Sequence, residues 1–214
     1  MSMVTDVLGQ HRAFMAKGRE LCMAQPWRER AFYENWLGQM YYFVAQSTRL
    51  IPFAAAHFDT DHEASFRRCL DHAKEEAGHE QQVINDLRAL GRRIEEFEEL
   101  PSTYLMHQGQ FHLISRVHPA SFFGISLYME GLSLAAGQEI CDAVLPAHGR
   151  AAASFLICHT QEDEQHTAQA ISQVKQLPAD AQVAVVRSMR LAHFCFSGMF
   201  DGVRQMAAPI PVAA

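Results

Sequence analysis

Three side chains that commonly bind metal ions recur at helical spacing in the last third of the chain. His159, Asp163 and His166 lie four and three residues apart. In a helix of 3.6 residues per turn, such positions project from one stripe within an arc of about 60°. Phe155 and Ala170 extend this stripe, which indicates that it faces the interior. Imidazole and carboxylate together suit iron or manganese. The alternative is a solvated polar face with an incidental histidine pair.

A second group of histidines and carboxylates lies about eighty residues earlier. His72, Glu75 and Glu76 share one helical face with His79. A glutamate three residues before a histidine is also the pairing of ferritin-like dimetal sites. The group has charged neighbours, so a charged outer helix face is the competing interpretation.

A single carboxylate, Glu130, interrupts a stretch of apolar and small residues from 126 to 137. A buried, ionised glutamate is costly without a partner. The partner is either a metal ion or one of the arginines Arg116, Arg150 and Arg187. Because two metal-prone stripes occur elsewhere, we favour a metal ion. We expect Glu130 to bridge two ions, since it comes from a third helix.

Apolar residues recur with a helical period along nearly the whole chain, and alternating runs typical of strands are absent. The pattern predicts an all-α fold of about seven helices in a single domain, residues 1–214, with a tail at 207–214. Pro52 is expected to kink or break the second helix. The expected helices span residues 4–24, 27–50, 63–90, 103–117, 120–145, 150–176 and 178–206.

Composition excludes several classes of function. The 214 residues are 49% hydrophobic, which allows a sizeable core. The net charge of −6, without a long basic tract, argues against a nucleic-acid partner. No segment approaches the roughly 18 uncharged apolar residues of a membrane span, and residues 1–20 lack a signal-peptide core, so we expect a cytoplasmic protein. Five scattered cysteines indicate reduced thiols.

Three segments together resemble the heme-oxygenase-like diiron oxidases and oxygenases. They are Glu76-Ala77-Gly78-His79, Tyr128-Met129-Glu130-Gly131 and His159-x3-Asp163-x2-His166, and the similarity covers residues 36–176. That family includes alkene-forming fatty-acid decarboxylases and amine N-oxygenases. Its scaffold extends to thiaminase-like proteins and pyrroloquinoline-quinone synthases. The resemblance therefore implies a heme-oxygenase-like helical bundle.

The resemblance also implies a ligand set for two ferrous ions that activate dioxygen. The set is Glu76, His79, Glu130, His159, Asp163 and His166. Some members of the family place the first glutamate where this chain has His72, so His72 or Glu75 could supply the first ligand instead.

The implied activity is an oxygen-dependent oxidation of a small metabolite. N-oxygenation of an amine or amino acid is slightly favoured over oxidative C–C cleavage or decarboxylation of a fatty or amino acid, because no long apolar segment is obviously shaped for a fatty chain. The candidates for substrate contact are Tyr42, Gln46, Phe123 and Ser126. An external electron donor and a homodimer are further expectations.

Other functions on the same scaffold stay open. A metal-free thiaminase-like hydrolase would use Cys141 or Cys158 as nucleophile, yet neither has a base at helical spacing. A cofactor-independent oxidase is a related alternative. A heme-binding or heme-degrading protein would need His11 as the proximal ligand. A non-enzymatic iron-binding or interaction role is the last alternative.

Overall fold

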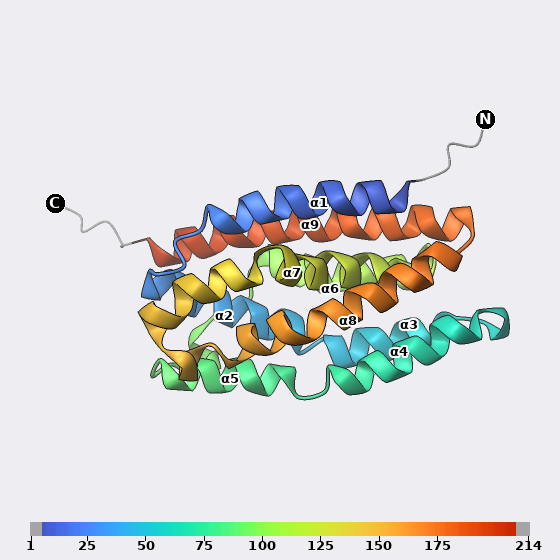
Figure 1. Cartoon of the computed structure of the whole chain (residues 1–214). Coiled ribbons are helices and arrows are strands. Elements are labelled where there is room, and N and C mark those ends of the chain that lie inside the picture. Colours follow the sequence, from blue (N-terminus) through green and yellow to red (C-terminus); the bar gives the residue numbers. More distant parts are fainter. Residues whose placement is uncertain (1–5, 209–214) are drawn as a thin grey trace.

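The computed structural model describes residues 6–208, which form an elongated bundle of α-helices without strands (Figure 1). Three short 3-10 helices, η1 (Thr60–His62), η2 (Ile94–Glu96) and η3 (Arg150–Ala152), join some of the longer elements. The α-helices of this part of the chain are α1 (Val7–Met23), α2 (Arg30–Val44), α3 (Ser47–His57), α4 (Glu63–Glu75), α5 (His79–Ala89), α6 (Pro101–Arg116), α7 (Ser121–His148), α8 (Ser154–Gln176) and α9 (Ala179–Ala207).

Helix α7 is the centre of the bundle. It packs most extensively against α8 and α9, and it also contacts α1 (Figure 1). Helices α1 and α9 run side by side along one long face. Helices α4 and α5 lie along the opposite edge of the bundle from α1 and α9, where both contact α8. Helix α3 packs against α4. Side chains from α4, α5, α7 and α8 can therefore meet in the interior.

The all-α prediction is confirmed, but the described residues form nine α-helices where seven were expected. The expected helix 27–50 is divided at Ala45 and Gln46, and the expected helix 63–90 is divided at residues 76–78. Pro52 lies inside α3 and does not end a helix. Pro146 likewise lies inside α7, which continues to His148. Of the expected tail, residues 209–214 lie outside the described part.

Gly78 explains the break between α4 and α5. Its φ is +99°, in the left-handed region that glycine adopts without a steric penalty. The helical period of the apolar residues continues in nearly the same phase after Gly78. The sequence pattern therefore does not reveal this turn. The consequence is local: Glu76 is the C-cap of α4, and His79 begins α5.

Close approach between α7 and α8 depends on a second glycine. A Cβ atom at Gly137 would lie 2.8 Å from Oγ1 of Thr160 on α8. A larger residue would push the helices apart at this point. The small residue thus helps to bring α8 close to α7, which carries Glu130.

A buried carboxylate from α5 caps the start of α8. Asp86 is fully buried and accepts hydrogen bonds from the backbone N–H of Ser154 at 2.9 Å, its hydroxyl at 2.6 Å and the N–H of Phe155 at 3.0 Å. Free N–H groups at a helix start need such acceptors. Because Asp86 lies two turns after His79 on the same face of α5, this cap also fixes α5 relative to α8.

The described helices, taken one by one, are too short or too polar to cross a lipid bilayer.

Removing the Asp86 cap should destabilise the whole bundle. We expect Asp86→Ala to lower the free energy of unfolding by about 2 to 3 kcal/mol, because it leaves buried N–H groups without acceptors. Asp59→Ala is the control, since Asp59 caps η1 on the exposed surface; its cost should stay below about 1 kcal/mol. Urea denaturation followed by circular dichroism measures both, and equal losses would contradict the proposed role of Asp86.

Candidate metal centre

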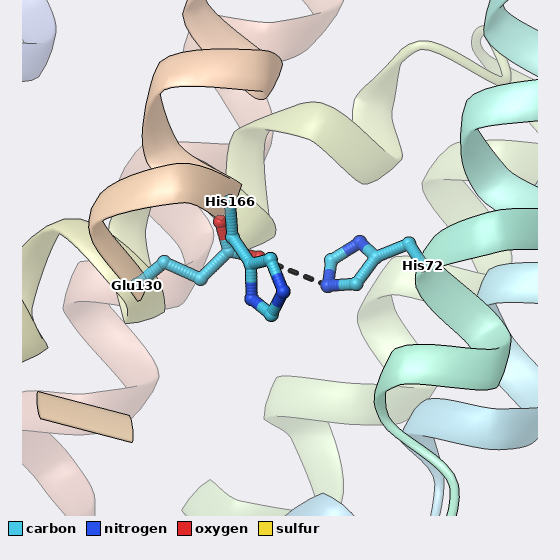
Figure 2. Close-up of side chains that lie close together, drawn as sticks. All are labelled: His72, Glu130 and His166. Carbon is cyan, nitrogen blue, oxygen red and sulfur yellow. Dashed lines mark ion pairs between the residues drawn. The ribbon is translucent and has the colours of Figure 1, made fainter. Parts of the chain in front are cut away.

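Two groups of three potential metal donors lie in the interior between α4, α5, α7 and α8. The first consists of His72 from α4, Glu130 from α7 and His166 from α8; within it one donor atom from each residue lies within 4.8 Å of the others (Figure 2). The second consists of Glu76 at the end of α4, His79 at the start of α5 and His159 from α8, under the same limit. Each group contains two imidazoles and one carboxylate.

Two carboxylates connect these groups. Glu76 Oε1 lies 3.4 Å from His72 Nε2 in the first group, while Oε2 lies 3.1 Å from His79 Nδ1 in the second. Asp163 Oδ1 lies 3.3 Å from His159 Nδ1 and 3.5 Å from His166 Nδ1. Glu76 thus contacts both groups in the described structure. The bridging role expected of Glu130 stays a prediction. Asp163 lies between the groups without being a member of either.

The protein environment shifts the pKa values of this cluster. Burial opposes the charged form of His72, but the carboxylates of Glu130 and Glu76 raise its pKa to about 9. Burial raises the pKa of Glu76, yet the imidazoles of His72 and His79 beside it hold the net value well below the ordinary range. The hydrogen bond with Asp163 raises the pKa of His159 despite its burial. Protons on the histidines therefore balance the buried carboxylates of the metal-free protein.

Buried donor atoms without hydrogen bonds support a cation at this position. His72 Nε2, Glu130 Oε2 and His159 Nε2 are all buried and lack a hydrogen-bond partner. His72 Nε2 lies only 3.2 Å from Glu130 Oε1, but the two atoms do not have the direction of a hydrogen bond. Buried polar atoms are rarely left unpaired. Each group offers two imidazoles and one carboxylate. This donor set fits a divalent iron ion that keeps some coordination positions open.

Glu75 occupies a different position from the six expected ligands. Its Oε2 accepts a hydrogen bond from Arg68 at 2.9 Å and lies 3.3 Å from His166 Nε2. The side chain of Glu75 is 35% exposed, whereas that of His166 is 7% exposed. Glu75 belongs to neither three-donor group. Arg68 lies two helical turns before Glu75 on α4, and the sequence analysis did not single it out.

The two groups open onto one cavity of about 960 Å³, part of it continuous with solvent. Its polar end is the metal centre itself, including His72, Glu130 and His159. The remaining wall is almost wholly apolar, and none of the described residues in it is a lysine or an arginine. Much of the wall comes from Trp36, Met40, Leu50, Ile51, Phe122 and Phe155.

Of the four residues expected to contact substrate, only Ser126 lies in the cavity wall. Its hydroxyl donates to Glu130 Oε1 at 2.7 Å. Tyr42 donates to the carbonyl of Phe97, Gln46 lies at the start of α3, and Phe123 is packed in the core, so the described cavity wall does not include these three, and their contact with a substrate stays a prediction. Their immediate neighbours line the cavity because adjacent positions on a helix point about 100° apart.

The structure also bears on two alternatives from the sequence, an arginine partner for Glu130 and a cysteine nucleophile. The described polar contacts of Glu130 are with Ser126 and His72, not with an arginine. Burial raises the pKa of Cys141. Cys158 Sγ lies 3.8 Å from His79 Nε2, a contact between helices that spacing along one helix could not predict.

The expected proximal histidine for heme is already engaged in helix packing. His11 Nε2 lies 3.1 Å from the carbonyl oxygen of Leu127, at hydrogen-bonding distance. A Cβ atom at Gly131 would lie 2.6 Å from Met15 Sδ, so α1 is packed directly onto α7 here. This geometry does not favour a heme between these helices.

Comparisons with known proteins agree with the geometry. A family of proteins described as iron-containing redox enzymes matches residues 34–193, which include all members of both donor groups. A search of curated proteins gives no significant match.

Two solved structures have a similar fold. One is a domain of unknown function with a heme oxygenase-like fold from Shewanella denitrificans, with a TM-score of 0.82, 16% identity and coverage of 94% of this chain and 93% of that one. The other is a TenA homolog from Pseudomonas syringae pv. tomato, with a TM-score of 0.75, 11% identity and the same coverage of both chains. At these identities the similarity establishes the heme oxygenase-like fold.

Metal binding should release protons. At pH 7 His72 of the metal-free protein is protonated, because its pKa is raised to about 9, whereas a histidine binds metal only when neutral. We expect His72 to release about one proton per chain at pH 7. This release should diminish as the pH rises through about 9, while the apparent metal affinity increases.

A pH-indicator titration with cobalt(II) in weak buffer measures this release. The variant His72→Gln should lack the His72 component while keeping the release from the other histidines. Identical proton release from the wild type and the variant at pH 7 would contradict the assignment.

Proposed function

The chain belongs to the family of iron-containing redox enzymes, and we propose that it is a non-heme diiron enzyme that uses dioxygen to oxidise a small metabolite. The observation that carries this proposal is the pair of donor groups, each with two histidines and one glutamate, at the end of one cavity. Two imidazoles and a carboxylate with open coordination positions are typical of non-heme iron oxygenases.

The residues of the centre have separate tasks in this proposal. His72, Glu130 and His166 would hold one iron, and Glu76, His79 and His159 the other. Asp163 lies against histidines of both groups, where it would bind metal or orient the rings. Bound iron would supply the electrons for reducing dioxygen.

The surrounding protein would control access to the centre. Ser126 holds Glu130 through its hydroxyl, which fixes the carboxylate toward the cavity. The apolar wall offers few hydrogen-bond partners to water in the space in which substrate and dioxygen would meet. Residues from α2, α3, α7 and α8 form this wall, so its shape depends on the packing of the whole bundle.

The cavity bears on the choice between the two expected reactions. An amino acid carries both an ammonium and a carboxylate, and each would need a partner when buried. Apart from the metal centre, the described cavity wall offers only hydroxyl, thiol and indole N–H groups as polar partners, and none of them is charged. An aliphatic substrate with a single polar group fits better. This observation favours oxidative C–C cleavage of a fatty acid over N-oxygenation of an amino acid.

Iron content and oxygen consumption test the proposed function. Anaerobic addition of ferrous iron to the metal-free protein should give about two irons per chain, and exposure to air should then consume oxygen. His159→Ala should lower the iron content to about one iron per chain. It should slow oxygen consumption by at least about 100-fold, which is more than the loss of a residue that only hydrogen-bonds to a metal ligand usually costs. His57→Ala, at an exposed histidine of α3, is the control. Full activity of His159→Ala would refute the diiron assignment.

Substrate preference is tested by substrate-stimulated oxygen uptake in the iron-loaded protein. We expect octanoate to accelerate uptake more than leucine, by about tenfold, because leucine leaves an ammonium without a partner in the apolar cavity. Product analysis by mass spectrometry then identifies the bond that is cleaved or oxidised. Faster uptake with leucine would restore amino-acid oxidation as the leading reaction.

A further inference from the structure

Charge is distributed unevenly over the bundle. Helices α1, α6 and α9 carry seven of the 18 lysines and arginines of the chain, but only three of its 24 carboxylates. These three helices therefore have a net charge of +4, and the rest of the chain has a net charge of −10. Helix α9 contacts both α1 and α6, and it runs beside α1 along one long face (Figure 1). An acidic protein thus has one basic region.

The outward side of α9 carries most of the exposed features of this region. On one flank His193 packs against Phe14 of α1, with ring centroids 5.4 Å apart. On the other flank Leu191 lies against Gly109 of α6, where a Cβ atom would be 2.6 Å from Leu191 Cδ2. At 100° per residue, three exposed positions project between these two flanks. This outer stripe consists of Arg187, Arg190 and Phe194.

The outer stripe has the composition of a recognition surface. Phe194 is 69% exposed, and exposed aromatic rings beside arginines are typical of protein interfaces. Neither arginine of the stripe forms an ion pair with a carboxylate among residues 6–208. Asp201, two turns beyond Phe194, is already paired with Arg204. The stripe therefore presents unbalanced positive charge, which attracts an acidic partner.

A hydrogen bond connects this surface with the helix that carries Glu130. The hydroxyl of Tyr128 lies 2.9 Å from His193 Nδ1, and Tyr128 is fully buried. Burial and the nearby cation of Lys17 lower the pKa of His193, so its neutral imidazole can accept this hydrogen bond. Tyr128 precedes Glu130 by two residues on α7. One hydrogen bond and a short run of covalent bonds therefore lead from His193 to a residue of the first donor group.

The proposed reaction creates a need for electrons from outside. Reduction of dioxygen to two waters takes four electrons, of which a two-electron oxidation of the substrate supplies two. The two ferrous ions supply the others and become ferric, so two electrons must return them to the ferrous state before the next turnover. Electrons cross proteins more readily along covalent and hydrogen bonds than across gaps between atoms.

We propose that the outer stripe of α9 docks an acidic protein that carries single electrons, and that His193 and Tyr128 conduct these electrons to the metal centre. This inference rests on the proposed diiron function and adds the partner that sustains it. The partner delivers two electrons per turnover in two encounters. Its acidic surface would complement the arginines, and Phe194 would supply an apolar contact.

Reversal of charge on the outer stripe tests the docking. The probe is an acidic plant-type [2Fe–2S] ferredoxin, whose binding to the metal-free and the iron-loaded protein is measured by calorimetry at low ionic strength. The double variant Arg187→Glu/Arg190→Glu should bind it at least about tenfold more weakly, and about 0.2 M salt should weaken the wild type similarly. The control Arg88→Glu/Lys175→Glu makes the same change in net charge at exposed positions of α5 and α8. Its affinity should stay within about twofold of the wild type.

Transfer of electrons is tested separately from docking. The iron-loaded, air-oxidised protein is mixed with reduced ferredoxin in a stopped-flow instrument, and the visible absorption of the ferredoxin reports its oxidation. Tyr128→Phe keeps the ring but removes the hydroxyl, so it should slow this oxidation by at least about tenfold at saturating ferredoxin without changing the binding affinity. His193→Phe removes the same hydrogen bond from the other side and should have the same effect.

Several results would overturn the proposal. Absence of ferredoxin binding is one, and equal weakening by the two double variants is another. Binding of anionic phospholipid vesicles in place of ferredoxin would assign the stripe to a membrane, and loss of a homodimer in Arg187→Glu/Arg190→Glu without ferredoxin binding would assign it to a second copy. Wild-type rates of ferredoxin oxidation in Tyr128→Phe and His193→Phe would refute the role of these residues. Failure of the wild type to hold two irons would instead refute the proposed diiron function, whereas docking is also measured on the metal-free protein.

Discussion

Buried carboxylates in an apolar bundle are the constraint on which the structure depends. Glu76, Glu130 and Asp163 lie in the interior, where an ionised group is costly unless a cation or a hydrogen-bond donor compensates it. The compensating groups are histidines, because the neighbouring carboxylates raise the pKa values of His72 and His159 and so favour their charged forms. Metal ions can replace those protons at the same donor atoms. This exchange links the stability of the interior to its capacity for chemistry.

The helices are arranged so that this exchange can take place. The left-handed turn at Gly78 separates His72 on α4 from His79 on α5, and each of these residues joins a different donor group. Asp86 holds the start of α8 against α5, so that His159 reaches the second group while His166 reaches the first. One long helix in place of α4 and α5 would change the directions of these side chains. Local backbone features thus determine the geometry of the centre.

The cavity has a polar end at the metal centre and an apolar end away from it. The polar groups lie at one end, and the apolar wall extends from them along α2, α3 and α7. In the proposed function, a substrate would be held by apolar contacts along its body and by its polar group at the centre. Because fold alone does not determine chemistry, it is this combination of donor set and cavity, with the family match, that supports an oxygen-dependent reaction over the metal-free alternatives.

The sequence by itself determined the fold class and the residues that converge, because helical periodicity and the i, i+3, i+4 and i+7 positions depend only on local geometry. It therefore predicted the stripe on α8, the odd carboxylate at Glu130 and the heme oxygenase-like resemblance. Tertiary structure alone decided which donors share a group, that Glu76 contacts both groups and that Arg68 holds Glu75. It also decided that the cavity wall contains the neighbours of Tyr42, Gln46 and Phe123 in place of these three residues. These outcomes depend on the rotation of each helix and on distances between helices, which arise from packing of residues far apart in the chain and leave no periodic signal in any one segment.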